Sequence, residues 1–134
     1  MSVLPRPLVW MLACCCVALV ACGARGASGP ESFVQQFYAT IASGQTEAAL
    51  DMISHADTRA EELSAARDKA TLLVSATHAT ISNAGGLDSV QIDEVYQTVG
   101  NHAKVTLTLR LTNGTQQQEI RKLVRKHRIW KTYL

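Results

Sequence analysis

The sequence lacks cysteine over most of its length. Its four cysteines lie at positions 14, 15, 16 and 22 of 134 residues, so the segment from residue 23 onwards contains none. That segment therefore cannot form a disulfide framework, a thiolate metal site or a cysteine nucleophile. A domain without spare thiols fits an oxidising compartment.

Aromatic residues and long apolar runs are also scarce. Phe, Trp and Tyr make up 5% of the sequence, so aliphatic side chains must fill the core of the single domain that this length allows. Only residues 8–21 form an uninterrupted apolar stretch, which is shorter than the roughly 20 residues of a membrane-spanning helix.

The four histidines, at positions 55, 78, 102 and 127, do not have the spacing of metal ligands. We expect neither a metal site nor a cofactor.

The beginning of the chain has the order of a secretory signal peptide. Arg6 precedes the apolar run, and small residues follow it. The run ends in the sequence LVACG at positions 19–23, which resembles the bacterial lipobox. The resemblance implies removal of residues 1–21, attachment of a diacylglyceryl group to the sulfur of Cys22, and a short tether over residues 22–29. An ordinary cleaved signal peptide or an uncleaved anchor is the alternative.

Lipidation would place the protein in the cell envelope, because two or three acyl chains suffice for stable anchoring. Gly23 stands where lipoproteins held in the inner membrane of two-membrane bacteria usually have Asp. The resemblance therefore implies the outer membrane, with the domain facing the periplasm.

Helical periodicity opens the segment 30–134. Pro30 suits the first turn of a helix, and apolar residues then recur at spacings of three and four, at positions 33, 34, 37, 38 and 41. Gly44 predicts the end of this helix, and Thr46 predicts the cap of a short second one. Asp57 or Thr58 predicts the cap of a third helix that runs to the early seventies.

After Gly85 and Gly86 the period changes from about 3.6 to two. A break in the alternation predicts a bulge near Asp93 and Glu94. In the next strand, four apolar residues (Val105, Leu107, Leu109 and Leu111) alternate with polar ones, so one face is buried. Asn113-Gly114 predicts a type I′ hairpin, with two further strands after it. The sequence thus predicts an α+β fold, with about three helices packed on a curved antiparallel sheet of about four strands.

Several of these segments resemble a family of bacterial lipoprotein domains of unknown function. They are Pro30 to Tyr38, Gly44 with Ala48-Ala49-Leu50, the Gly114 hairpin and the closing Ile129-Trp130-Lys131. That family has the nuclear-transport-factor-2-like (NTF2-like), or cystatin-like, cone fold and is related to lumazine-binding-like domains. The resemblance implies that residues 30–134 form such a cone. It carries no catalytic motif, and the fold itself does not imply an activity.

A pocket between the helices and the sheet would be lined by Glu94, Tyr96, Val105, Leu107 and Leu109. A carboxylate and a phenol on one side of a strand could perform general acid–base chemistry; the alternative is a solvated strand face. The aliphatic residues would instead form a filled core or an apolar slot, since a binding pocket needs some convergent polar groups.

Charge is distributed unevenly along the chain. Residues 31–101 contain ten acidic and three basic residues, whereas residues 119–134 contain six basic residues and one acid. Arg121, Lys122, Arg125 and Lys126 are therefore candidates for contact with an anionic surface such as lipid head groups. The alternative is an ordinary solvated strand face.

These observations predict a membrane-anchored module that binds an envelope protein or a small apolar ligand, without catalytic activity and without nucleic acid as a partner. One alternative is an inhibitor or immunity-type lipoprotein that blocks a cell-wall hydrolase. A second alternative is a small cone-fold enzyme that uses Glu94 and Tyr96.

Overall fold

A computed structural model describes residues 29–134 of the chain. The predicted signal peptide, the lipidation site at Cys22 and most of the tether lie outside the described residues. The elements follow the order of three helices and then four strands: α1 (Pro30–Ala42), α2 (Thr46–Asp51), α3 (Leu63–Asn83), β1 (Leu87–Gln97), β2 (His102–Leu111), β3 (Gln116–Lys126) and β4 (Ile129–Tyr133). A 3₁₀ turn at Ala60–Glu62 leads into α3.

Helix α1 forms as the apolar spacing predicts. Pro30 occupies its first turn, and the stripe that ends at Ile41 is buried. The helix stops at Ser43, and Gly44 follows with a φ of +79°. Glycine adopts this left-handed conformation without the steric cost that a Cβ brings, which is why it ends the helix.

The second and third helices differ in detail from the expectation. Gln45, and not Thr46, is the residue that caps α2, and its side chain makes no capping hydrogen bond. Helix α3 runs on to Asn83, well beyond the predicted end, because Val74 and Ile81 continue the buried stripe that begins at Ala70. None of the helices within residues 29–134 is long and apolar enough to cross a membrane.

The four strands form one antiparallel sheet in the order β1-β2-β3-β4. A register shift between Ile92 and Glu94 confirms the predicted bulge. Beyond β4, Ile53 adds a parallel bridge to Thr132. The backbone amide of Ser54 donates to the carbonyl of Thr132 at 2.7 Å, which fixes the segment after α2 against this edge.

The predicted type I′ turn at Asn113-Gly114 is wrong. Only Gly114 has a positive φ there, and its amide donates to the carbonyl of Leu111 while the amide of Leu111 donates to Thr115. This is the pattern of a type I turn followed by a bulged glycine. The two-residue loop between β3 and β4 has the type I′ signature instead, since His127 and Arg128 have φ values of 51° and 66°.

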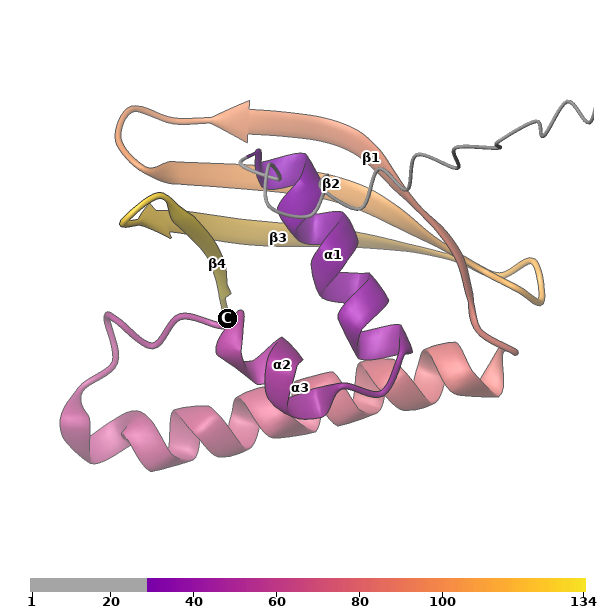
Figure 1. The fold of residues 1–134 in the computed structure, drawn as a ribbon, viewed down its shortest axis with the longest axis horizontal. Helices are drawn as coiled ribbons and strands as arrows, with labels where there is room; N and C mark the ends of the chain where they lie inside the picture. Colours follow the sequence, from indigo (N-terminus) through magenta and orange to yellow (C-terminus); the bar gives the residue numbers. More distant parts are fainter. Residues whose placement is uncertain (1–28) are drawn as a thin grey trace, which may run out of the picture.

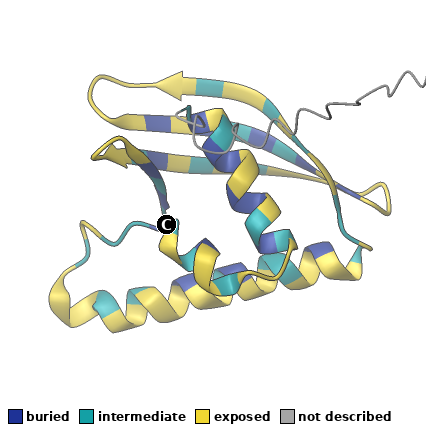
Figure 2. Ribbon diagram, viewed as in Figure 1, coloured by how far each residue is buried: buried dark blue, intermediate teal, exposed yellow. Residues whose placement is uncertain are grey.

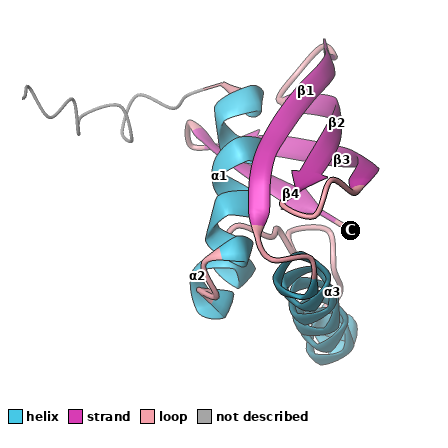
Figure 3. Cartoon of the chain, turned by 90° about the vertical axis from the view of Figure 1, so that its right-hand side faces the viewer, coloured by secondary structure: helices cyan, strands magenta, loops and turns pink. Residues whose placement is uncertain are grey.

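Helix α1 crosses the inner face of the sheet. Helix α3 runs below both the sheet and α1 in this view, on the side of β3 (Figure 1). Figure 3 shows α1 against one face of the sheet, with α3 seen nearly end-on below. The buried residues gather where α1 faces β2 (Figure 2). Among the described residues 29–134, the hydrophobic core extends from Phe33 to Trp130.

Candidate functional site

The inside of the cone is a filled core. Val105, Leu107 and Leu109 on β2 are 0%, 0% and 1% exposed, and they pack in one cluster with Phe37 and Tyr38 of α1. Their alternation along the strand points all three at the helix, as the sequence predicts. These three candidate pocket residues are therefore part of the core and line no open space.

Glu94 and Tyr96 lie on the opposite face of the sheet. Glu94 pairs with Thr106 and Tyr96 pairs with Lys104, while Val95 between them pairs with the buried Val105. Tyr96 is 61% exposed, and Glu94 is exposed as well. The predicted pocket of five residues is thus not formed, because the bulge sets Val95 inward and turns both of its neighbours to solvent. The alternative of a small cone-fold enzyme requires Glu94 and Tyr96 to face a pocket inside the cone, and neither side chain does.

The four basic candidates on β3 do not form one surface either. Successive residues of a strand point to opposite faces, so Arg121 and Arg125 lie on the inner side while Lys122 and Lys126 lie on the outer side. The guanidinium of Arg125 stands 5.3 Å from the ring centroid of Trp130 and donates to Asn101. The predicted patch therefore separates into two partnered arginines and two outward lysines.

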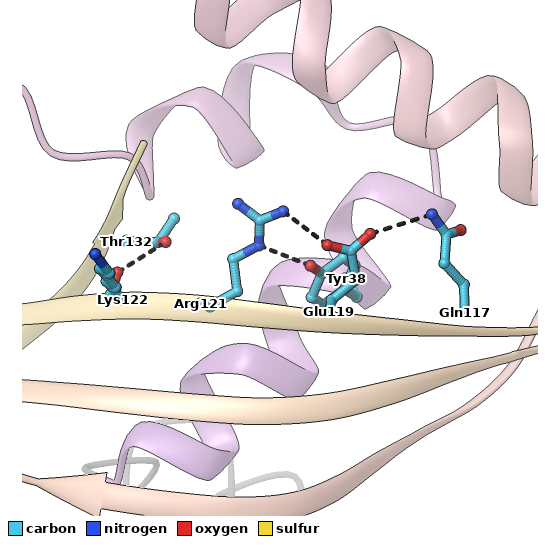
Figure 4. A network of polar contacts seen from close by, with 6 residues as sticks. All are labelled: Tyr38, Gln117, Glu119, Arg121, Lys122 and Thr132. Carbon is cyan, nitrogen blue, oxygen red and sulfur yellow. Dashed lines mark hydrogen bonds and ion pairs between the residues drawn. The ribbon is translucent and has the colours of Figure 1, made fainter.

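A polar network closes the core on the side of β3 (Figure 4). Nε of Arg121 donates to the hydroxyl of Tyr38 at 2.9 Å, and its Nη2 lies 3.3 Å from Oε2 of Glu119. Gln117 donates to the other oxygen of that carboxylate at 3.2 Å. Burial raises the pKa of Tyr38 above its ordinary value of 10.0, and the charge and hydrogen bond of Arg121 oppose that rise. No local pattern of the sequence signals this contact, because its two ends are far apart along the chain.

Open space is found outside the core, next to the segment 53–58. We use "the groove" for a hollow of about 440 Å³ at this place. It is lined by Ile53, Ser54, His55, Ala56, Val124, Lys126, His127, Ile129 and Lys131. An adjoining hollow of about 270 Å³ shares Ser54, His55, Ala56 and Val124 with it, and continues to Lys69 of α3 and Tyr133.

The groove has a positive rim. No acidic residue lines it, and its charged or titratable side chains are those of Lys126, Lys131, His55 and His127. Within residues 29–134, the only ion pair joins Arg121 to Glu119. No local pattern of the sequence signals this site, because the segment 53–58 and strand β4, which both line it, are far apart along the chain.

The histidines do not gather around a metal site. Nδ1 of His78 lies 2.9 Å from the carbonyl oxygen of Ile41, which ties α3 to the end of α1. In the described part of the chain, no cluster of three or more His, Cys, Asp or Glu side chains could hold a metal ion.

Comparison with protein-family models and with curated proteins finds no match. Among solved structures, the chain is similar to a protein of Campylobacter jejuni named "Putative NTF2-like transpeptidase", with a TM-score of 0.71 and 26% identity over 79% of this chain and 98% of that one. It is also similar to a SEC-C motif containing protein of Rhodopseudomonas palustris, with a TM-score of 0.50 and 17% identity over 83% of this chain and 81% of that one. The fold is NTF2-like, which confirms the cone that the sequence predicts.

Proposed function

We propose that the protein is a lipid-anchored, non-catalytic binding module of a bacterial cell envelope. The diacylglyceryl group on Cys22 would hold it in the outer membrane, with residues 30–134 facing the periplasm. The support for this address is the sequence of residues 6–23, with its basic start, its apolar run and its lipobox.

The filled interior supports binding over catalysis. Leu107, on the inner face of the sheet, is 0% exposed, so the core leaves no room for a substrate beside it. The name of the Campylobacter jejuni structure refers to transpeptidation, which needs an activated nucleophile. Residues 29–134 contain no cysteine. Ser54, beside the groove, accepts a hydrogen bond from the amide of Ala56, and no histidine contacts it by a hydrogen bond among the described residues.

The anchor is tested by intact-mass spectrometry of protein extracted from membranes. A chain that starts at Cys22 and carries diacylglyceryl and acyl groups is the expected product. Cys22→Ser should remove the lipid mass from the product, because the sulfur that carries the diacylglyceryl group is absent. The matched control Cys16→Ser, which removes a thiol within the signal peptide, should leave the lipidated product unchanged. A free thiol at residue 22 of the membrane product would overturn the proposal.

The binding role is tested by site-specific photo-crosslinking in intact cells. A crosslinking amino acid at Ala56, exposed beside the groove, should give an adduct of one defined mass. The same amino acid at Ala79, exposed on α3, serves as the matched control and should give none. Equal adducts from both positions, or none from either, would argue against a binding surface here.

An inhibitor of a cell-wall hydrolase is the second candidate function. The observation that favours it is an excess of exposed acidic residues in the helical part, where Glu47, Asp51, Asp57, Glu61, Glu62 and Asp68 outnumber the exposed Arg59, Arg67 and Lys69. Such a surface complements a basic enzyme. Added domain should then slow lysis by a basic muramidase, and Glu61→Lys/Glu62→Lys should abolish the effect. An unchanged lysis rate with wild-type domain would exclude this role for that enzyme class.

A further inference from the structure

The groove is built by two walls that the sheet edge brings together. One wall is the outward face of the β3–β4 hairpin, where Val124 pairs with Lys131 and Lys126 pairs with Ile129. The other wall is the segment from Ser54 to Ala56, held by the 2.7 Å hydrogen bond to Thr132. Each strand of the hairpin thus presents an apolar and a cationic side chain in alternation.

Apolar side chains form the floor of the groove. Ile53 is 3% exposed and Val124 is half-buried, so these two are already covered by the fold. Ile129 is 60% exposed. An exposed isoleucine beside a concave apolar surface is stabilised when a ligand covers it, and the volume of about 440 Å³ falls in the usual range of small-molecule sites.

The two lysines of the rim make no polar contact with the part of the chain that the structure describes. Within residues 29–134, the amines of Lys126 and Lys131 make neither an ion pair nor a hydrogen bond. Lys131 also lines a second hollow with Glu47 and Asp51, and no salt bridge joins it to either carboxylate. A groove with an apolar floor and two such lysines on its rim complements a molecule that combines an apolar chain with an anionic group.

The groove also lies at the end of the domain where the chain enters it. A further hollow is lined by Phe33 and Gln36 of the first turns of α1, together with Arg128 and Ile129 of the β3–β4 turn. Cys22 precedes Pro30 by eight residues, which span at most about 28 Å when fully extended. A lipid on Cys22 would therefore keep the groove within reach of the bilayer.

We propose that this groove binds an anionic amphiphile of the lipid class. Its acyl or alkyl chain lies along Ile53, Val124 and Ile129, and its phosphate or carboxylate head lies between Lys126 and Lys131. The inference rests on the proposed function as a binding module and names the ligand class of that module. It does not require that Cys22 be lipidated, so the two proposals can fail separately.

Calorimetric titration of the chain 23–134, which retains every core residue that the structure describes, tests the ligand class with three probes. Dodecyl phosphate, used below its micellar concentration, carries both the chain and the anion and should bind saturably at one site. Dodecyl maltoside has the chain without the charge, and inorganic phosphate has the charge without the chain. Each should bind at least about tenfold more weakly than dodecyl phosphate, because the maltoside lacks the contact with the lysines and phosphate lacks the contact with the apolar floor. Equal binding of the neutral probe, or displacement by phosphate alone, would overturn the proposal.

Variants then locate the site. Lys126→Gln/Lys131→Gln should weaken the binding of dodecyl phosphate about tenfold, because two charge-assisted contacts are removed. Lys104→Gln/Lys122→Gln, a pair of exposed outer-face lysines that do not line the groove, is the matched control and should change affinity less than about twofold. Ile129→Ser tests the floor and should also weaken binding without unfolding the domain. Equal losses in the two lysine pairs would show general charge attraction and would contradict a groove.

Discussion

The side chain of Arg121 on β3 reaches across the core edge to the hydroxyl of Tyr38 on α1, with Nε and the oxygen 2.9 Å apart. This contact joins the first helix to the third strand, where the inner face carries polar residues instead of aliphatic ones. Tyr38 is 1% exposed, so its hydroxyl would be buried without a partner if the arginine were absent. The network therefore stabilises the closed cone by satisfying a group that burial would otherwise penalise.

Tyr38→Phe removes the acceptor of this hydrogen bond. We expect the free energy of unfolding to fall by about 1–2 kcal/mol, because the half-buried guanidinium of Arg121 loses a partner. Urea denaturation followed by circular dichroism measures the change. Tyr96→Phe is the matched control, and its exposed hydroxyl predicts a change within about 0.5 kcal/mol. Equal costs at the two positions would contradict the structural role of the contact.

The raised pKa of Tyr38 predicts a loss of stability at alkaline pH. Well below pH 10 the phenol is neutral in the folded and the unfolded chain. As the pH rises past 10.0 the unfolded chain ionises first, so the free energy of unfolding falls until the folded phenol also ionises. Urea midpoints between roughly pH 9 and 11 measure this slope. The slope should decrease in Tyr38→Phe and persist in Tyr96→Phe; the same slope in both variants would assign it to other groups.

The two hairpin turns predict opposite effects of glycine. Arg128 adopts a φ of 66°, so Arg128→Gly should stabilise the domain by about 1 kcal/mol, because the left-handed conformation costs a residue with a Cβ. Gly114→Ala should destabilise it by a similar amount, since Gly114 has a φ of +88° and open space around it. Denaturation midpoints of the two variants check this. A destabilised Arg128→Gly would contradict the turn assignment.

Leu107→Ala tests whether the cone is filled. The side chain is fully buried, so its truncation should cost about 2–5 kcal/mol and leave an apolar cavity. Leu72→Ala, at a position that is 71% exposed, should cost little. Xenon or benzene should bind to the Leu107→Ala variant and not to the wild-type domain, as followed by ¹³C-methyl shifts. Binding of either probe inside the wild-type cone would reveal an existing cavity.

Much of the fold could be predicted from local patterns. The alternation from Val105 to Leu111 fixed the buried face of β2, and the phase break near Asp93 located the bulge. The predicted type of the turn at Asn113-Gly114 is wrong, because this dipeptide suits more than one type of turn. The hydrogen bond that the carbonyl of Leu111 accepts and the one that its amide donates decide between the types. Helix α3 is longer than predicted, because only Val74 and Ile81 are buried beyond the predicted end, and two apolar residues seven positions apart are a weak helical pattern.

The site could not be predicted in the same way. The groove depends on the contact between Ile53 and Thr132, which are separated by most of the domain. The predicted pocket on β1 and β2 is not formed. The register of β1 against β2 decides which face of the sheet Glu94 occupies, and the spacing of the residues along the chain does not. Basic residues adjacent on β3 point to opposite faces, so a cluster in the sequence did not become a cluster on the surface.

We expect ligands to bind this domain at its outer groove and not inside the cone. Methyl and amide shift mapping of the chain 23–134 with dodecyl phosphate distinguishes the two places. Saturable shifts are expected at Ile53, Ala56, Val124 and Ile129, with the methyls of Val105, Leu107 and Leu109 unchanged. Shifts confined to those core methyls would place the ligand within the cone and exclude the groove as its site.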